Sequence, residues 1–398
     1  MRAIARSRSG ALLAVLSIST VSTGLIFIAI PLELRSLRAT PQEIGVTLSM
    51  FGLGFFVTEL AWGLIADRAG YRWPMVASQI LYALGVFLMA RSNTVFLIAA
   101  SYLFASGMLV AVGPIGRSFL GTTLPSHLRA TGLAALSAEW LIGDAVGAGA
   151  GGLLIERFGI QNVLYVAAVL PLISGVLLIL VFRGYVDSRS SAAVAPEAST
   201  SNGASNIARV LLVTAAIMVL FQLGLAGETA LLPLLVTAHL NLSAATAGTA
   251  LFAAGIFGGV LLVPGGIASD RWGRRAAMVA GGLASAVGFA LYALAGVFGV
   301  VLAAAAVRAF GSSLIWPAAT AWISEAAPPR RHGLMMGLFG EFENLGVTLG
   351  PVVGGIAWSI AGIQAAFVTY AVAALLAAVV AAYAGRLTGV RTRRLTSE

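Results

Sequence analysis

The sequence predicts an all-α membrane protein whose twelve transmembrane helices form two pseudo-symmetric six-helix bundles. Three observations carry this prediction. Hydrophobic residues make up 59% of the 398 residues and charged residues only 10%, whereas about a quarter of the residues of a soluble domain are charged. The apolar residues gather in twelve long runs. The second half of the chain also repeats the first half at a fixed spacing.

Each of the twelve runs is close to the length of about 20 apolar residues that a helix needs to cross the hydrocarbon core. Their continuity favours helices over barrel strands, which alternate apolar and polar residues. A helix also satisfies every backbone amide within its own segment. The runs of the first half are 11–34, 43–66, 74–91, 95–121, 131–155 and 162–182. Those of the second half are 209–236, 245–268, 276–296, 298–325, 334–360 and 363–385.

The N-terminal run follows Arg2, Arg6 and Arg8, as a secretory signal would. It is too long for the apolar core of a signal peptide, so we interpret it as the first transmembrane helix. Between the sixth and seventh runs the chain is rich in Ser and Ala, a composition typical of flexible linkers. The predicted domains are an N-terminal bundle (1–183), a cytoplasmic linker (184–208), a C-terminal bundle (209–386) and a cytoplasmic tail (387–398).

All 24 basic residues are arginines, and their placement predicts the topology. The odd-numbered breaks between runs hold only Arg35, Arg38, Arg91 and Arg157. Arg117 and Arg308 lie inside runs, and all other arginines lie in the even-numbered breaks and the two tails. Because cytoplasmic loops carry the excess of arginine, both termini are expected on the cytoplasmic side of the cell inner membrane. The net charge of +9 therefore indicates topology, and we expect no nucleic-acid partner.

The two halves are related by a constant offset: adding 203 to a residue number in the first half repeatedly gives a like residue in the second. This offset implies duplicated units that lie parallel across the membrane, an arrangement found in transporters. The matching residues are Gly63, Asp67, Arg68, Gly70 and Arg72 with Gly266, Asp270, Arg271, Gly273 and Arg275; Pro114 and Pro125 with Pro317 and Pro328; and Gly143, Gly147, Gly151 and Gly152 with Gly346, Gly350, Gly354 and Gly355.

The loop after the second run, 63–72, and its repeat, 266–275, both read G-x-x-x-D-R-x-G-x-R. They resemble the loop that defines the major facilitator superfamily, and helix count, central linker and both loop copies extend the resemblance over nearly the whole chain. The resemblance implies the major facilitator fold, a transporter and not an enzyme, and loops that lock the inner face when the cavity opens outward. Numbering the predicted helices by run, Asp67 is expected to face the start of helix 11 (334–360) in this lock. Glu325 could pair with Arg275.

A stripe of glycines on helix 5, Gly143 to Gly152, recurs on helix 11, where Pro351 follows Gly350. Small residues at every fourth position let helices pack closely in lipid, so packing alone explains such a stripe. The second copy is also similar to the G-x3-G-P-x2-G-G pattern that antiporters of the superfamily carry on helix 5. On helix 5 itself Ala148 replaces the proline. The surviving glycine spacing points to the drug:proton antiporter branch.

Ionisable groups inside spans cost free energy unless they are paired or hydrated, so each is a functional candidate. Arg117 and Glu139 lie at similar depth on the hairpin of helices 4 and 5, which predicts an ion pair with either a structural or a coupling role. Glu59, about two turns from Asp67, is expected to support the loop motif. Asp144 sits near mid-helix beside the glycine stripe, with no arginine evident at its depth.

In the superfamily, helices 1, 4, 7 and 10 line the central cavity. By that resemblance Glu228 and Arg308, which are comparable in depth, are expected to face substrate, and the other cavity candidates are Arg117, Phe221 and Trp316. Desolvation disfavours the charged form of an unpaired acid, which suits a group that carries a proton. The candidates for proton coupling are Asp144, Glu228 and Glu139.

The leading hypothesis is a proton-coupled exporter of amphipathic or hydrophobic small molecules that works by alternating access. It needs no cofactor and no metal, only a proton gradient, a small-molecule substrate and the lipid bilayer, and we expect a monomer. The alternative is a transporter of a small organic anion or metabolite, with Arg117 and Arg308 as anion ligands. An enzyme fits less well, because the chain has no cysteine and the spans hold no Ser–His or paired-Asp arrangement. A non-transporting membrane sensor also fits less well, because the longest loop is too short and too polar to fold as a soluble domain.

Overall fold

The computed structural model describes residues 8–185, 204–328 and 332–388, and these residues are almost entirely helical, with no strand among them. Twelve of the described helical spans are long and apolar enough to cross a membrane. The helices of the N-terminal half are α2 (Arg8–Ser36), α3 (Pro41–Ala69), α4 (Arg72–Arg91), α5 (Val95–Leu109), α6 (Val112–Thr123), α7 (Ser126–Phe158) and α8 (Ile160–Val181). Those of the C-terminal half are α9 (Ala204–Leu234), the π-helix η1 (Leu235–His239), α10 (Ala244–Trp272), α11 (Arg274–Ala293), α12 (Phe298–Ala326), α13 (His332–Ala361) and α14 (Ile363–Thr388).

Two boundaries differ from the sequence prediction. The helix α9 begins at Ala204, inside the segment that was predicted as linker. The fourth span is broken into α5 and α6, because Pro114 has no N–H to donate to Val110. Gly113 donates to that carbonyl instead, and Ala111 turns to Met108.

The turn between α5 and α6 leaves the carbonyl of Gly107 without its usual helical donor, and α3 supplies two donors in its place. The indole Nε1 of Trp62 donates to it at 2.7 Å and the hydroxyl of Thr58 at 2.8 Å. A carbonyl in a membrane-spanning segment must be satisfied by protein. The break is therefore held rigidly against α3.

The repeat is visible in the backbone as well as in the sequence. Left-handed or glycine-type conformations occur in pairs related by the same offset of 203: Arg38 with Asn241, Gly70 with Gly273, and Gly159 with Gly362. The caps also match, since Thr40 caps α3 and Ser243 caps α10. Like turns at like positions confirm that the two halves are copies of one bundle.

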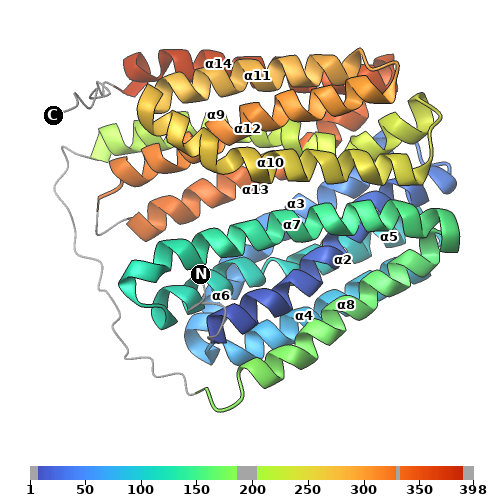
Figure 1. The fold of residues 1–398 in the computed structure, drawn as a ribbon, viewed down its shortest axis with the longest axis horizontal. Coiled ribbons are helices and arrows are strands. Elements are labelled where there is room, and N and C mark those ends of the chain that lie inside the picture. Colours follow the sequence, from blue (N-terminus) through green and yellow to red (C-terminus); the bar gives the residue numbers. More distant parts are fainter. Residues whose placement is uncertain (1–7, 186–203, 329–331, 389–398) are drawn as a thin grey trace.

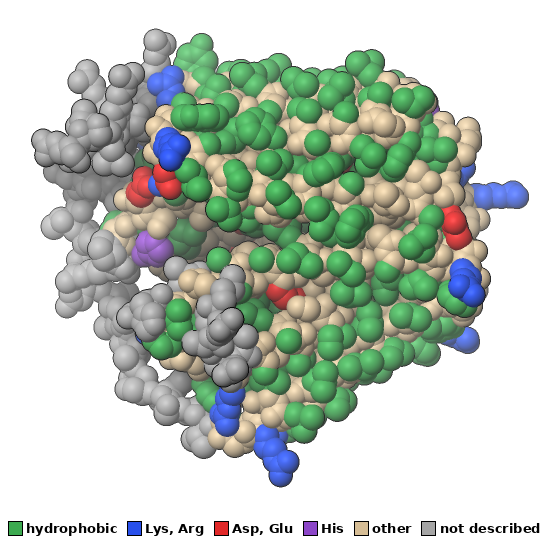
Figure 2. All heavy atoms as spheres, viewed as in Figure 1, with side chains coloured by type: hydrophobic (Ala, Val, Ile, Leu, Met, Phe, Trp, Pro, Cys, Tyr) green, Lys and Arg blue, Asp and Glu red, His purple; other side chains and the backbone are tan. Residues whose placement is uncertain are grey.

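Each half packs as its own bundle, and the two bundles meet along two seams (Figure 1). Within the N-terminal half α7 packs on α2, and within the C-terminal half α13 packs on α9. One seam joins α3 to α13 and the other joins α7 to α10. Hydrophobic side chains cover most of the flank shown in Figure 2, and most charged side chains on this face lie towards the two ends. Such a belt is what a lipid-facing surface requires.

The two ends of the molecule differ. We call the end that holds Gly70 and Gly273 the linker end, and the end that holds Gly159 and Gly362 the far end. At the far end the seams are closed: a Cβ added to Gly248 would lie 2.6 Å from the carbonyl oxygen of Ala148, and one added to Gly45 would lie 3.0 Å from the Cα of Gly355.

Towards the linker end the seams separate. Gly259, Gly337 and Gly340 lie on the seam faces of α10 and α13, yet a Cβ on any of them would have no neighbour within 4 Å. A hollow between the two halves opens in this direction (Figure 2). The structure is therefore closed at the far end and open at the linker end, with a central cavity between the bundles.

Candidate functional site

A polar bridge crosses the cavity where the seam of α3 and α13 begins to part. Glu59 of α3 accepts from Arg117 of α6 at 2.6 Å and from the amide of Asn344 of α13 at 2.8 Å. Glu59 thus links the two bundles. This arrangement corrects two expectations: Arg117 pairs with Glu59 and not with Glu139, and Glu59 serves the cavity and not the loop motif.

Two further acids of α13 lie near this bridge. Glu343 accepts a hydrogen bond of 2.7 Å from the indole of Trp316 of α12. Both Glu343 and Glu341 are close enough to Glu59 to interact electrostatically with it. The polar part of the cavity therefore holds three acids, one arginine and an indole, among which Arg117 and Trp316 were predicted cavity residues.

The interior of the N-terminal bundle holds a second pair of acids, both on α7. Glu139 is only 8% exposed, and its Oε1 accepts from the hydroxyl of Thr20 at 2.8 Å. Its Oε2 and the Oδ1 of Asp144 are buried without a hydrogen-bond partner. The indole of Trp140 lies within hydrogen-bonding reach of the Asp144 carboxyl group. No ion pair involves either acid among the described residues.

Hydroxyl and amide groups surround these acids on the neighbouring helices. Ser22 and Thr23 of α2 lie 3.2 and 3.3 Å from the phenol oxygen of Tyr82 of α4. Ser19 donates to Gln79, one turn away from Tyr82. These groups make the interior of the N-terminal bundle polar enough to hold a hydrated proton or to relay one. No cation is described among them.

In the C-terminal bundle, unlike the N-terminal one, the buried acid is paired with an arginine. Glu228 of α9 and Arg308 of α12 are 2% and 5% exposed and form an ion pair of 2.5 Å. Tyr292 of α11 donates to the same carboxylate at 2.8 Å. Their similar depth was correctly foreseen, but the expected exposure to substrate is wrong for this conformation. Both charges, and Phe221 with them, lie inside the bundle and away from the cavity.

One position of the repeated loop motif has a charged partner in the second half and a hydroxyl partner in the first. Arg274 binds Glu325 at 2.8 Å and Asp270 at 2.5 Å, so the predicted partner of Glu325, Arg275, was wrong by one residue. In the first half Tyr71 occupies the place of Arg274, and its hydroxyl lies 3.3 Å from Thr122, which occupies the place of Glu325.

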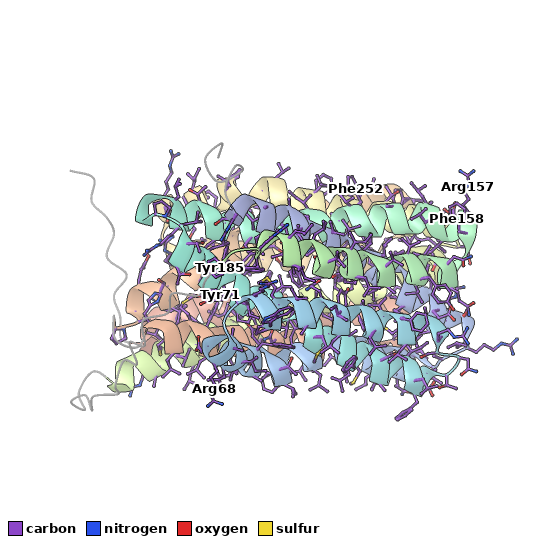
Figure 3. The ribbon with its side chains drawn as sticks, turned by 90° about the horizontal axis from the view of Figure 1, so that it is seen from below. Arg68, Tyr71, Arg157, Phe158, Tyr185 and Phe252 are labelled. Carbon is purple, nitrogen blue, oxygen red and sulfur yellow. The ribbon has the colours of Figure 1, made fainter. Side chains whose placement is uncertain are left out.

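Figure 3 shows how this end of the N-terminal half is arranged. The ring of Tyr71 lies beside that of Tyr185, with centroids 6.4 Å apart, while Arg68 points away from the bundle. Tilted ring contacts and hydroxyl contacts of Tyr71 therefore anchor this part of the first loop. Arg68 lies at the surface.

The glycine stripes serve two different interfaces. Gly143, Gly147 and Gly151 face α2 inside the N-terminal bundle, and only Gly152 faces α10 of the other half. The stripe on α13 is arranged in the same way. Gly346, Gly350 and Gly354 face helices of the C-terminal bundle, chiefly α9, and only Gly355 faces α3 of the other half. Most of each stripe therefore packs within its own bundle, and only its last glycine meets the other bundle.

Comparisons with known proteins agree with this architecture. The family model of the Major Facilitator Superfamily matches residues 12–235 and 214–397. An uncharacterized MFS-type transporter of Bacillus subtilis, YuxJ, is 28% identical over 80% of this chain and 82% of its own. The quinolone resistance protein NorA of Staphylococcus aureus is 24% identical over 83% of this chain and 85% of its own.

Solved structures of the same fold superpose over nearly the full chain. The nucleoside transporter NupG matches with a TM-score of 0.75 at 14% identity, over 96% of this chain and all of that structure. A bacterial homologue of the human lysosomal transporter Spinster, in an inward-facing state, matches with a TM-score of 0.77 at 12% identity, over 96% of each chain. At such low identity these likenesses bear on the fold alone.

Proposed function

The chain belongs to the major facilitator superfamily of membrane transporters, and from this premise we propose that it exports amphipathic or hydrophobic small molecules in exchange for protons, by alternating access. The observation that carries the proton coupling is the pair of acids Glu139 and Asp144, which the N-terminal bundle encloses without a cation among the described residues. A buried carboxyl group in such surroundings favours its neutral form and can take up and release a proton as hydration changes.

Alternating access is supported by the shape of the molecule. The two bundles touch closely at the far end and separate at the linker end. Rocking one rigid bundle against the other would close the linker end and open the far end around a fixed central site. Glu59 and its partners Arg117 and Asn344 lie at the point where the seam parts, so this bridge is well placed to respond to both substrate and motion.

Aromatic and acidic side chains within the membrane-spanning helices support the proposed substrate class. Trp316 lies beside Glu343, and Trp140 packs edge-to-face on Phe55 at 6.1 Å. Aromatic faces suit flat, amphipathic molecules, and carboxylates suit those that carry a positive charge. The staphylococcal relative is named for quinolone resistance, which is consistent with an exported drug-like molecule.

The alternative of a small organic anion has less support. Its two proposed ligands were Arg117 and Arg308, and each already pairs with a carboxylate, Glu59 or Glu228. An anion would have to displace these carboxylates. We therefore place the anion transporter second.

We further propose that the transporter works as a monomer in the cell inner membrane, with the linker end and both termini in the cytoplasm. The arginine distribution supports this orientation. In this orientation the described conformation is open to the cytoplasm. No cofactor takes part in the proposal, because the proton gradient supplies the energy.

The test is accumulation in everted membrane vesicles with an imposed pH gradient, acid inside. Ethidium and norfloxacin serve as probes, and vesicles without the protein serve as the control. We expect the protein to drive accumulation of at least one probe, and nigericin, which collapses the pH gradient, to abolish it. Accumulation that persists unchanged with nigericin would contradict proton coupling, and no accumulation of either probe would contradict the proposed substrate class.

A further inference from the structure

The seam between α7 and α10 ends in a contact that no sequence motif indicated. At the far end, Oε1 of Glu156 on α7 accepts a hydrogen bond of 2.8 Å from the backbone N–H of Ala245, in the first turn of α10. The hydroxyl of Ser243, which caps α10, also bonds to this carboxylate. One half of the protein thus supplies an anion to the start of a helix in the other half.

This contact combines two favourable interactions. The first N–H groups of a helix have no partner within the helix, so the carboxylate satisfies a donor that would otherwise need water. The helix dipole also places partial positive charge at this end, which attracts an anion. A hydrogen bond to an ionised group is stronger than one between neutral groups.

The other seam carries a different contact at the same place. By the offset of 203, Ser359 corresponds to Glu156 and Gln42 corresponds to Ala245, and the amide of Gln42 donates to the hydroxyl of Ser359 at 2.9 Å. Both seams are therefore fastened at the far end. Among the described residues, a charge fastens the seam of α7 and α10 and neutral groups fasten that of α3 and α13. Outside the two seams, Arg35 of α2 also donates to the hydroxyl of Thr237 of η1 at 3.3 Å across this end.

From this geometry we infer that Glu156 is a positioning residue of the transport cycle, which holds the far end closed and so favours the conformation open at the linker end. The contact joins two bundles, so the far end cannot open while it persists. The inference rests on the alternating access proposed above. It concerns which state is favoured, and not which substrate is carried.

The neighbouring residue provides a matched control. Arg157 is exposed, and its guanidinium lies over the ring of Phe158 on its own helix, 5.6 Å from the centroid (Figure 3). It has the same depth and a full charge, yet it makes no described contact with α10. Its truncation tests whether any change of charge at the far end shifts the equilibrium.

The experiment measures the distance between spin labels across each end of the protein. The chain has no cysteine, so introduced pairs are labelled selectively. Gln161→Cys with Leu242→Cys reports the far end, and Ala69→Cys with Leu334→Cys reports the linker end; all four positions are exposed. The wedge variant Gly248→Leu is included, because any side chain there meets Ala148 across the seam.

For Glu156→Ala we expect about a fivefold increase in the ratio of far-end-open to far-end-closed molecules, the usual effect of losing a helix cap. Glu156→Gln keeps an acceptor oxygen and is expected to shift the ratio less, and Arg157→Ala is expected to match the unmodified protein. Melting temperatures verify that each variant is folded.

Three outcomes distinguish the proposed role of Glu156 from the proposed rocking of the bundles. Opening in both Gly248→Leu and Glu156→Ala, but not in Arg157→Ala, supports the role of Glu156. Opening in Gly248→Leu while Glu156→Ala keeps the unmodified distances overturns that role and leaves alternating access intact. A folded Gly248→Leu variant that stays closed at the far end overturns the rocking of the bundles, and the inference about Glu156 with it.

Discussion

The acids inside the two halves have opposite surroundings, and this contrast underlies the roles proposed for them. Glu228 faces a guanidinium at 2.5 Å and a phenol at 2.8 Å, so its charge is compensated where it lies. Glu139 and Asp144 each keep a buried oxygen without a hydrogen-bond partner. An uncompensated carboxyl group responds to hydration by gaining or losing a proton, whereas an ion pair resists doing so.

The first prediction concerns Asp144→Asn, which imitates the protonated form permanently. We expect accumulation driven by a pH gradient to fall at least tenfold in everted vesicles, because the group can no longer release a proton. Binding of the probe is expected to remain near its original affinity, because Asp144 lies inside the N-terminal bundle and not at the bridge of Glu59. A variant that still accumulates the probe at the normal rate would exclude Asp144 as the proton carrier.

The second prediction concerns the ion pair of Glu228 and Arg308. Glu228→Gln leaves a buried guanidinium without its counter-ion, which costs on the order of 3–5 kcal/mol and lowers the melting temperature in detergent. The double variant Glu228→Gln with Arg308→Leu removes both charges and is expected to recover much of that loss. If the double variant melts no higher than Glu228→Gln, then removing the unpaired guanidinium recovers no stability, and the expected compensation between the two charges is wrong.

At the scale of elements, the structure shows one fold built from two sets of contacts. The turns after α3 and α10 have the same backbone, with Gly70 at φ 78° and Gly273 at φ 84°, a region that favours glycine. The side chains that hold these turns differ. One turn is held by the ion pair of Arg274 with Glu325, and the other by the hydroxyl contacts of Tyr71.

The third prediction follows from this exchange of partners. Arg274→Tyr removes the described partner of Glu325, and Glu325→Thr leaves Arg274 with Asp270 and Ser269. Each single change is expected to lower stability by at most about 1 kcal/mol, since the pair is partly exposed. The double change recreates the neutral pair of the first half. We expect it to melt closer to the unmodified protein than the sum of the single changes implies. Additive losses would show that the two positions are not equivalent.

At the scale of the whole molecule, the two seams determine access. Along the closed part of the seams the backbones approach within contact distance at Gly45 with Gly355 and at Gly152 with Gly248. Beyond Glu59 the same helix faces separate. Because the close contacts between the bundles stop short of the linker end, the proposed rocking of one bundle against the other would leave the core of each bundle intact.

The fourth prediction tests this asymmetry by labelling. Gly337 lies on the same face of α13 as Asn344, two turns nearer the linker end, and has open space in front of it. We expect Gly337→Cys to react readily with a polar maleimide in everted vesicles, which present the linker end to the medium. Gly337→Cys combined with Gly248→Leu is expected to react several-fold more slowly, because opening the far end closes the linker end. Equal rates in the two proteins would contradict the coupling of the two ends.

The sequence alone determined the class of fold, because length, hydropathy and arginine placement are properties that a bilayer selects directly. The offset of 203 likewise predicted the paired bundles, since a duplicated sequence folds into a duplicated unit. The similar depth of Glu228 and Arg308 could be foreseen because depth in a membrane follows from position in a span, whereas their ion pair inside the bundle could not.

The tertiary structure decided what depth cannot determine, namely which side of a helix meets which neighbour. Similar depth predicted Glu139 as the partner of Arg117, whereas the packing of α3 against α6 brings Glu59 to it. The same holds for Glu325, which reaches Arg274 and not Arg275, because adjacent residues point about 100° apart on a helix. The role of Glu156 depends on a helix of the other half, which sequence spacing within one half could not locate.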